Sequence, residues 1–256
     1  MDFKPKLVAF DLDGTLAESK QRVSADMGEL LCKLMQKMPI AVLSGAAFHQ
    51  FENQLLPALP MNTPLERLYL FPTSAAACYV FENHAWHSRY DHTFTPEEKT
   101  HIMGALNEAL KETGLAEPPT QVWGERIEDR GGEITFSALG QKAPFEIKSR
   151  WDPDKLKRMP LRAALLRRLP ECSVAVNATS SIDITRKGIT KAYGIRQLAD
   201  ISGISVSEML YVGDTLKEGG NDAVVIETGV RTQEVSGPEE TARFIEDILL
   251  THTLVP

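Results

Sequence analysis

Residues 7–16 read LVAFDLDGTL, a short apolar run that leads into two aspartates, a glycine and a threonine. An uninterrupted apolar run of this length, Leu7 to Phe10, is typical of a buried parallel strand. Such a strand would place Asp11 and Asp13 at its carboxyl end, where open α/β sheets bind ligands. Two carboxylates this close repel each other unless a proton or a cation lies between them. The stretch therefore predicts an α/β fold with an acidic site at one edge of its sheet; the alternative is an acidic strand end followed by a plain turn.

Helical and strand patterns alternate on both sides of a distinct middle region. Apolar residues at helical spacing follow Ser24 as far as Met38, and Ser24 is suited to cap that helix. The alternation predicts a parallel sheet with helices on both faces. The other predicted elements here are strands at 40–43, 209–212 and 223–226 and helices at 46–56, 188–201 and 239–250.

The middle region, residues 86–186, is predicted to be a separate α+β module inserted into the α/β domain formed by residues 1–85 and 187–256. Its successive strands are close enough in sequence to pair antiparallel, and Gly131-Gly132 suits a hairpin turn. Pro160 is expected to break or kink one of its helices. The predicted elements are helices at 97–112 and 154–168 and strands at 122–127, 133–138, 173–176 and 181–185.

The composition is that of an ordinary globular protein: 43% of its 256 residues are hydrophobic and 25% are charged. The net charge of −7 argues against a nucleic-acid partner, which needs a basic face. Three widely spaced cysteines without a CxxC pair argue against a disulfide framework or a zinc site and favour a reducing cytoplasm. No apolar run approaches the roughly 18 residues that a membrane-spanning helix needs, so no membrane partner is expected.

A second acidic stretch, GDTLKEGGND at residues 213–222, also follows an apolar strand pattern. The strand would place Asp214 at its carboxyl end, and a glycine-rich loop then presents Asn221 and Asp222. These side chains could supply further oxygen ligands to an ion held by Asp11, and Mg²⁺ prefers such hard ligands. The alternative is a solvated loop between strands.

Two single residues complete the chemistry that a phosphoryl group would need. Ser44, followed by Gly45, comes directly after the predicted strand at 40–43, where a hydroxyl and a backbone N–H can bind a phosphoryl oxygen. Taken alone, Ser44 would more simply cap a helix. Lys191, near the start of a predicted helix, could offset negative charge on the transferring group, with Lys187 as a competitor.

These four features, in this order, resemble the haloacid dehalogenase-like (HAD) phosphotransferase superfamily. The insertion between Ser44 and Lys191 resembles the large cap of subclass IIB, which includes Cof-type sugar phosphatases and phosphomannomutases. The spacing within residues 213–222, the SIDI stretch at 181–184 and the hairpin after Arg130 are most similar to eukaryotic-type phosphomannomutases. The resemblance implies a Rossmann-like HAD core with an inserted cap.

The resemblance also implies roles for individual residues. Asp11 would be the nucleophile that forms an aspartyl-phosphate, and Asp13 the general acid/base. Ser44, Gly45 and Lys191 would hold the transferring phosphoryl group.

Mg²⁺ is the implied cofactor, and the remaining site residues divide between the metal and the substrate. Asp11, Asp214, Asp222 and the backbone carbonyl of Asp13 would form the metal site, with Asp222 binding directly or through water. The residues implied in substrate binding, besides Gly45, are Arg130, Ser181, Asp183 and Asn221. The implied partners are a small phosphorylated sugar and a second copy of the chain, bound through the cap.

One position departs from the phosphomannomutase pattern. Gln141 follows Gly140 where the family has an arginine, and glutamine cannot make the charged bidentate contact that arginine gives a phosphate. Lys142 or Arg126 would have to compensate. Because a mutase must hold a phosphate at either end of its sugar, the departure favours a sugar-phosphate phosphatase. The alternatives are a phosphomannomutase and, with less support, a non-catalytic sugar-phosphate binder.

Overall fold

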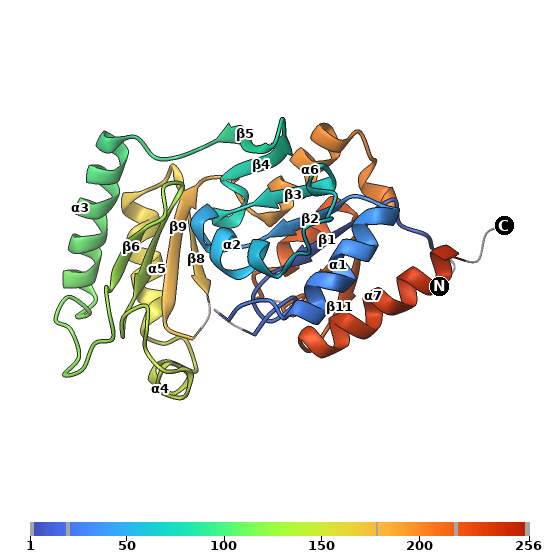
Figure 1. Cartoon of the computed structure of the whole chain (residues 1–256). Helices are drawn as coiled ribbons and strands as arrows, with labels where there is room; N and C mark the ends of the chain where they lie inside the picture. Colours follow the sequence, from blue (N-terminus) through green and yellow to red (C-terminus); the bar gives the residue numbers. More distant parts are fainter. Residues whose placement is uncertain (1–2, 19–20, 178, 218–219, 254–256) are drawn as a thin grey trace. The chain divides into compact units, whose positions relative to one another are not determined.

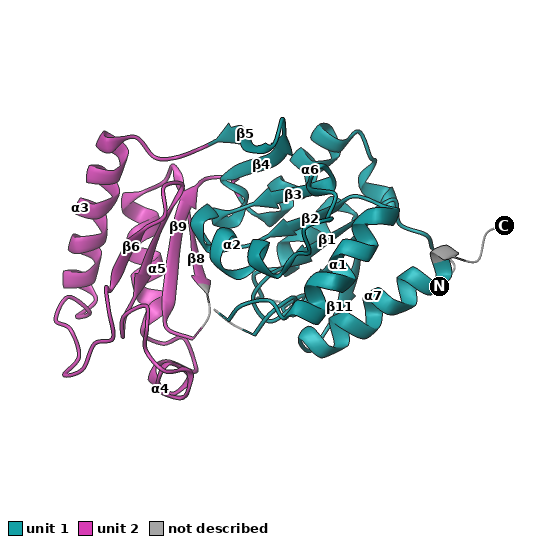
Figure 2. Ribbon diagram, in the orientation of Figure 1, with its two compact units in different colours: residues 1–91, 190–256 teal, residues 92–189 magenta. Residues whose placement is uncertain are grey.

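The computed structural model describes residues 3–18, 21–177, 179–217 and 220–253, which form two compact units. Unit 1 comprises residues 1–91 and 190–256, and unit 2 comprises residues 92–189 (Figure 2). The boundary expected after residue 85 falls inside strand β5 (Ala85–Asp91). This strand belongs to unit 1 because it pairs antiparallel with β4 (Ala77–Glu82) in a hairpin that extends the sheet of unit 1.

Unit 1 is built on a seven-stranded sheet in the order β11-β10-β1-β2-β3-β4-β5 (Figure 1). The five strands from β11 to β3 are parallel, and β4 and β5 add an antiparallel edge. The α/β fold with a parallel sheet is therefore confirmed. The remaining strands are β1 (Leu7–Asp11), β2 (Ile40–Leu43), β3 (Leu68–Phe71), β10 (Met209–Gly213) and β11 (Arg231–Glu234).

Strand β1 is buried on both faces, as its unbroken apolar sequence predicts. Val8 and Phe10 join a core with residues of helices α1 (Ala25–Lys37) and α7 (Pro238–Thr253). Leu7 and Ala9 face the opposite way, into a core with residues of α6 (Lys191–Ser202). Full burial of a side chain such as Phe10 contributes about 1.5–3 kcal/mol, so the strand that ends at Asp11 is firmly anchored.

Two segments of unit 1 differ from the prediction. Residues 223–226, expected to form a strand, lie in a 3₁₀ helix (Ala223–Thr228), and the edge strand is β11 instead. A short apolar run does not distinguish the two structures, and here Val225 packs against the α6 side of the core. The hairpin between β4 and β5 was not predicted, because its turn uses Asn83 and His84 at positive φ (51° and 64°) without a glycine. Helix α2 (Phe48–Gln54) is shorter than expected.

Unit 2 contains a four-stranded antiparallel sheet in the order β6-β7-β9-β8, with helices α3 (Pro96–Glu112) and α5 (Arg158–Arg168) over one face. Ile134, Phe136, Ile182 and Ile184 pack against these helices. The alternate residues of β7 and β9 therefore form a second, polar face. The strands are β6 (Ile127–Asp129), β7 (Glu133–Ser137), β8 (Cys172–Asn177) and β9 (Ser181–Arg186), and α4 spans Phe145–Trp151.

Two predictions for unit 2 were wrong in detail. A strand was expected at 122–127, but the strand observed here, β6, spans Ile127–Asp129 and pairs with β7. The helix expected from residue 154 begins at Arg158, so Pro160 lies in its first turn. Proline is tolerated there because the first N–H groups of a helix have no intrahelical acceptor.

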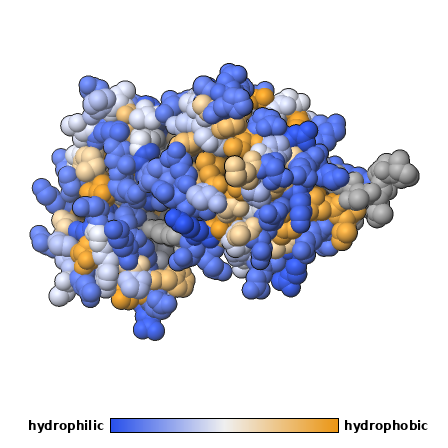
Figure 3. Space-filling view, viewed as in Figure 1, coloured by the Kyte–Doolittle hydropathy of each residue, from blue (hydrophilic) through white to orange (hydrophobic). Residues whose placement is uncertain are grey.

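Hydrophilic residues predominate on the visible surface (Figure 3). None of the helices in the described part of the chain is long and apolar enough to cross a membrane. Cys32, Cys78 and Cys172 are all buried and free, in keeping with the cysteine spacing. The homodimer implied by the resemblance stays a prediction.

Candidate active site

The carboxyl ends of three neighbouring strands in unit 1 carry the predicted core residues. Asp11 ends β1, Ser44 follows β2 and Asp214 follows β10. Because β1 pairs in parallel with both β2 and β10, these ends meet at one edge of the sheet. Lys191 reaches the same edge as the first residue of α6, whose N-cap Thr190 accepts a hydrogen bond from the backbone N–H of Tyr193.

Lys191 joins two carboxylates in a buried ion network. Its Nζ lies 2.5 Å from Oδ1 of Asp11 and 2.5 Å from Oδ1 of Asp222. Burial by itself lowers the pKa of Lys191, but the charges of Asp11 and Asp222 outweigh it and raise this pKa well above its ordinary value. Lys191 is therefore a permanent cation in contact with Asp11. Lys187, the competing candidate for this role, is exposed and belongs to unit 2.

Asp11, Asp214 and Asp222 offer carboxylate oxygens that all lie within 4.8 Å of one another. Burial raises the pKa of Asp11 to about 7; Lys191 opposes this rise, while the charges of Asp222 and Asp214 add to it. Burial, followed by the charge of Asp222, raises the pKa of Asp214 to about 6. Both shifts come first from burial and then from the repulsion between neighbouring carboxylates, and a divalent cation would relieve that repulsion.

Two glycines make room for these carboxylates. Gly14 has a φ of 86°, and a Cβ added there would overlap Oδ2 of Asp214. A Cβ at Gly213 would lie 2.6 Å from Oδ2 of Asp222. The close approach of backbone and carboxylates therefore depends on glycine at both positions. The three carboxylates are oxygen donors of the kind that a hard cation such as Mg²⁺ prefers.

Asp13 and Asn221 lie beside this cluster and are not part of it. Asp13 is half-buried, and its charge adds to the rise in the pKa of Asp214. Asn221 is exposed, and its side-chain oxygen accepts a hydrogen bond from the hydroxyl of Thr215.

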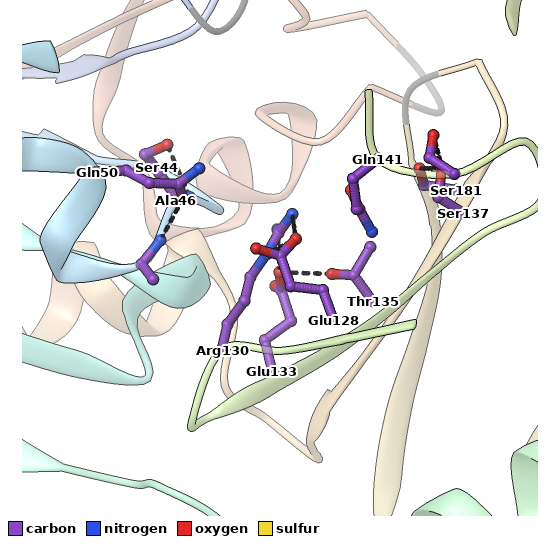
Figure 4. A network of polar contacts seen from close by, with 12 residues as sticks. Ser44, Ala46, Gln50, Glu128, Arg130, Glu133, Thr135, Ser137, Gln141 and Ser181 are labelled. Carbon is purple, nitrogen blue, oxygen red and sulfur yellow. Dashed lines mark hydrogen bonds and ion pairs between the residues drawn. The ribbon is translucent and has the colours of Figure 1, made fainter. Parts of the chain in front are cut away.

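Ser44 is buried, and its hydroxyl oxygen accepts a hydrogen bond from the backbone N–H of Ala46 at 3.0 Å (Figure 4). It does not cap α2, because the N-cap is Ala47. The backbone N–H of Ala47 donates to Oε1 of Gln50 at 2.7 Å. The helix-cap interpretation of Ser44 is therefore wrong. The bond from Ala46 to the Ser44 hydroxyl closes a turn over Gly45 at the end of β2.

A left-handed turn that was not predicted supports Ser44. Thr73, Ser74 and Ala75 have φ values of 49°, 55° and 70°, although none of them is glycine. The backbone N–H of Ser74 donates to the carbonyl of Ser44, and that of Thr73 donates to the carbonyl of Ala46, both at 2.9 Å. A left-handed residue other than glycine costs about 1–2 kcal/mol, so no ordinary sequence signal announces such a turn.

In unit 2, the predicted substrate residues lie on the polar face of the sheet. Thr135 on β7 pairs with Asp183 on β9, and the hydroxyl of Ser181 donates to that of Ser137 at 3.4 Å (Figure 4). Arg130 lies in the turn that leads into β7. The structure thus gathers Arg130, Ser181 and Asp183 in the same part of unit 2.

Arg130 is held by two glutamates that sequence reasoning did not single out. Its Nη1 lies 2.9 Å from Oε1 of Glu133, and its Nη2 lies 2.8 Å from Oε2 of Glu128 (Figure 4). Burial lowers the pKa of Arg130, but the charges of Glu133, Asp183 and Glu128 outweigh it and raise this pKa above its ordinary value. Three carboxylates therefore surround one guanidinium. The Gly131-Gly132 turn, which brings Glu133 back to Arg130, was the available signal.

Arg126 does not replace the arginine that is absent at Gln141. Its guanidinium donates to the backbone carbonyls of Ala138, Ala116 and Leu115 and lies 5.1 Å above the ring of Phe136. These contacts commit it to the fold of unit 2. Lys142 is exposed and remains the other candidate.

Comparison with known proteins identifies the family. The model of the eukaryotic phosphomannomutase family matches residues 27–251. A phosphomannomutase of Spinacia oleracea is 27% identical over 98% of this chain and 99% of its own length, and that of Saccharomyces cerevisiae is 24% identical over 96% and 95%.

Solved structures share the fold. A haloacid dehalogenase-like hydrolase of Bacteroides thetaiotaomicron superposes with a TM-score of 0.65 at 16% identity, covering 96% of this chain and all of that one. A Plasmodium falciparum IMP-nucleotidase gives a TM-score of 0.69 at 15% identity, covering 96% of this chain and 70% of its own. With the phosphoryl-transfer motifs in place, the chain is an enzyme of the HAD superfamily and belongs to the eukaryotic phosphomannomutase family.

Proposed function

We propose that this enzyme transfers a phosphoryl group of a hexose phosphate through an aspartyl-phosphate on Asp11. The contact between Lys191 Nζ and Asp11 Oδ1, 2.5 Å long and buried, is the observation that carries the proposal. It fixes one carboxylate oxygen, while Oδ2 of Asp11 accepts no hydrogen bond from the described residues. An oxygen so placed is available to attack phosphorus.

In the first half-reaction, Asp11 attacks the phosphorus and the bond to the sugar oxygen breaks. Asp13 gives its proton to that leaving oxygen, as a general acid. The ammonium of Lys191, the hydroxyl of Ser44 and the backbone N–H of Gly45 hold the phosphoryl oxygens and offset their charge.

Mg²⁺ is the cofactor we propose for this site. Asp11, Asp214 and the backbone carbonyl of Asp13 would hold it, and the ion would neutralise charge on the transferring phosphoryl group. Its binding also explains why carboxylates with raised pKa values are kept together at this sheet edge.

For the second half-reaction, we propose transfer of the phosphoryl group to a hexose monophosphate, which is the phosphomannomutase reaction when a hexose bisphosphate is the first donor: that donor leaves as a hexose monophosphate, and the acceptor becomes a new bisphosphate. The family match and the names of the relatives support this choice. Asp13 then takes the proton of the attacking sugar hydroxyl. Arg130, Ser181 and Asp183 are the residues we propose for contacts with the part of the sugar remote from the transferred group.

Hydrolysis of the aspartyl-phosphate by water is the second candidate. The charge around Arg130 favours it: one guanidinium is shared among Glu128, Glu133 and Asp183, and Gln141 adds no positive charge. Such a surface holds a second phosphate weakly, and a mutase needs to hold one at each end of its sugar.

Phosphorus NMR of mannose 1-phosphate with the enzyme and Mg²⁺ separates the two reactions. Hexose 6-phosphate that accumulates only with a hexose bisphosphate activator supports the mutase. Inorganic phosphate that grows regardless of activator supports the phosphatase. An Asp11→Asn variant as active as the wild type would overturn both.

A further inference from the structure

Asp222 accepts four hydrogen bonds from its own chain. Its Oδ1 accepts from Lys191 Nζ at 2.5 Å and from the Tyr211 hydroxyl at 2.6 Å. Its Oδ2 lies 2.9 Å from the Thr215 hydroxyl, which shares its one proton between Asp222 and the side-chain oxygen of Asn221, and accepts from the Thr215 backbone N–H at 3.3 Å. A carboxylate offers about four lone-pair positions, so Lys191 and Tyr211 fill Oδ1, and Thr215 lies against Oδ2 with both its hydroxyl and its backbone N–H.

Asp11 and Asp214 differ from Asp222 in this respect. In the described part of the chain, Asp11 accepts only the bond from Lys191, and no side chain donates to the carboxylate of Asp214. A metal ion would find oxygens ready on these two residues. On Asp222 it would have to displace a donor that is itself buried.

Tyr211 is an unusual residue for its position. It lies in β10 between Leu210 and Val212, is completely buried and packs in the core beside α6. A phenyl ring would fill that apolar site equally well. The hydroxyl is needed only for its bond to Asp222, because a buried phenol requires a partner.

We infer that Tyr211 is a positioning residue for phosphoryl transfer, which together with Thr215 holds Asp222 against Lys191 and away from direct metal ligation. The inference rests on the proposed function and revises the expectation that Asp222 is a ligand. Asp222 acts through Lys191: with Tyr211 and Thr215 occupying its other lone pairs, it keeps the ammonium directed at Asp11.

The kinetic test is Tyr211→Phe, which removes the hydroxyl and leaves the ring. We expect kcat to fall about 10-fold, as for other residues that orient a catalytic group, while KM and the affinity for Mn²⁺ stay within twofold of the wild type. Tyr69→Phe, in β3, is the matched control, since Tyr69 packs against the same core without contacting the carboxylates. A Tyr211→Phe enzyme with wild-type kcat would overturn the inference.

Thr215 provides a second variant should Tyr211→Phe fold poorly. Thr215→Val removes the hydroxyl donor to Asp222 and should lower kcat, whereas Thr215→Ser keeps the donor and should recover most of it. Equal kcat values for the two variants would contradict a positioning role.

Crystals of the enzyme soaked in Mn²⁺ test the metal part independently of activity. We expect anomalous density bound by Asp11 and Asp214, with no oxygen of Asp222 at ligand distance. Direct ligation by Asp222 would overturn the inference and leave the proposed function intact. Failure of the proposed function has its own signature, an active Asp11→Asn enzyme.

Discussion

Lys191 Nζ lies 2.5 Å from Oδ1 of Asp11, although the two residues are 180 positions apart in the chain. Asp11 ends β1, before unit 2 in the sequence, and Lys191 begins α6, after unit 2, and within unit 1 the fold brings these two ends together. Both side chains are buried, so the pair interacts with little screening by water.

Replacing Lys191 by methionine should lower kcat by at least about 10³-fold, because the cation that offsets charge on the phosphoryl group is lost. It should also destabilise the protein in the absence of metal, since Asp11 and Asp222 then remain buried without a counter-charge. Steady-state kinetics and thermal unfolding measure the two effects. Lys187→Met is the control: Lys187 is exposed in unit 2, and a comparable loss in that variant would contradict the assignment.

The β4–β5 hairpin offers a prediction about stability alone. His84 is exposed and left-handed, with a φ of 64°, and it follows Asn83 in a two-residue turn that favours Asn-Gly. His84→Gly should therefore raise the free energy of unfolding by about 0.5–1 kcal/mol, with activity unchanged. Urea titrations give the value. His84→Ala keeps the strained φ, and an equal gain in that variant would show that conformation is not the cause.

The sequence predicted that the aspartates would lie together, because strand ends fix where side chains go. Asp11 and Asp214 each follow an apolar run, and parallel strands bring such residues to one sheet edge. The left-handed turn at Thr73–Ala75 escaped prediction because it lacks the glycine or asparagine that usually marks this conformation.

Other features depended on tertiary packing that a single sequence does not reveal. The run at 223–226 has no periodicity that separates a strand from a helix, and only its contact with the α6 side of the core decides. The bond from Tyr211 to Asp222 joins a residue that resembled plain strand core to the end of a loop. The sequence therefore indicated that Asp11 and Asp214 lie at one sheet edge and gave no sign of the bond from Tyr211 to Asp222.

Asp152 and Arg158 form a second buried pair, in unit 2, which makes stability depend on pH. Burial raises the pKa of Asp152, but hydrogen bonds from the backbone N–H groups of Lys157 and Arg158 and from the Arg158 side chain outweigh it, so this pKa lies below its ordinary value. A lowered carboxyl pKa stabilises the fold above the ordinary value of 3.8, and the stabilisation is lost as the pH falls through the native pKa.

Asp152→Asn should accordingly cost about 3 kcal/mol of unfolding free energy at pH 7, because the Arg158 charge stays buried. The cost should shrink as the pH falls below 4 towards the native pKa. Urea unfolding of both proteins across pH 3–7 measures the difference, and the exposed Asp154→Asn is the control. A difference that is constant with pH would mean that the ion pair is not its source.

We expect a substitution at Glu133 to alter whether water or a sugar phosphate accepts the phosphoryl group from Asp11. Its carboxylate lies 2.9 Å from Arg130, and Glu128 occupies the other side of the guanidinium at 2.8 Å. Glu133→Met together with Gln141→Arg removes one negative charge and adds one positive charge on unit 2. Because a charge-assisted hydrogen bond contributes about 1.5–3 kcal/mol, the KM for a hexose bisphosphate should fall roughly tenfold or more.

In the phosphorus NMR assay, the same double variant should form more hexose 6-phosphate per inorganic phosphate than the wild type, since the phosphorylated sugar stays bound long enough to accept the phosphoryl group from Asp11. Glu97→Met, an exposed substitution on α3, controls for the loss of a negative charge elsewhere on unit 2. An unchanged product ratio in the double variant would mean that the charge around Arg130 does not govern the acceptor, and that the sugar is recognised through its hydroxyls alone.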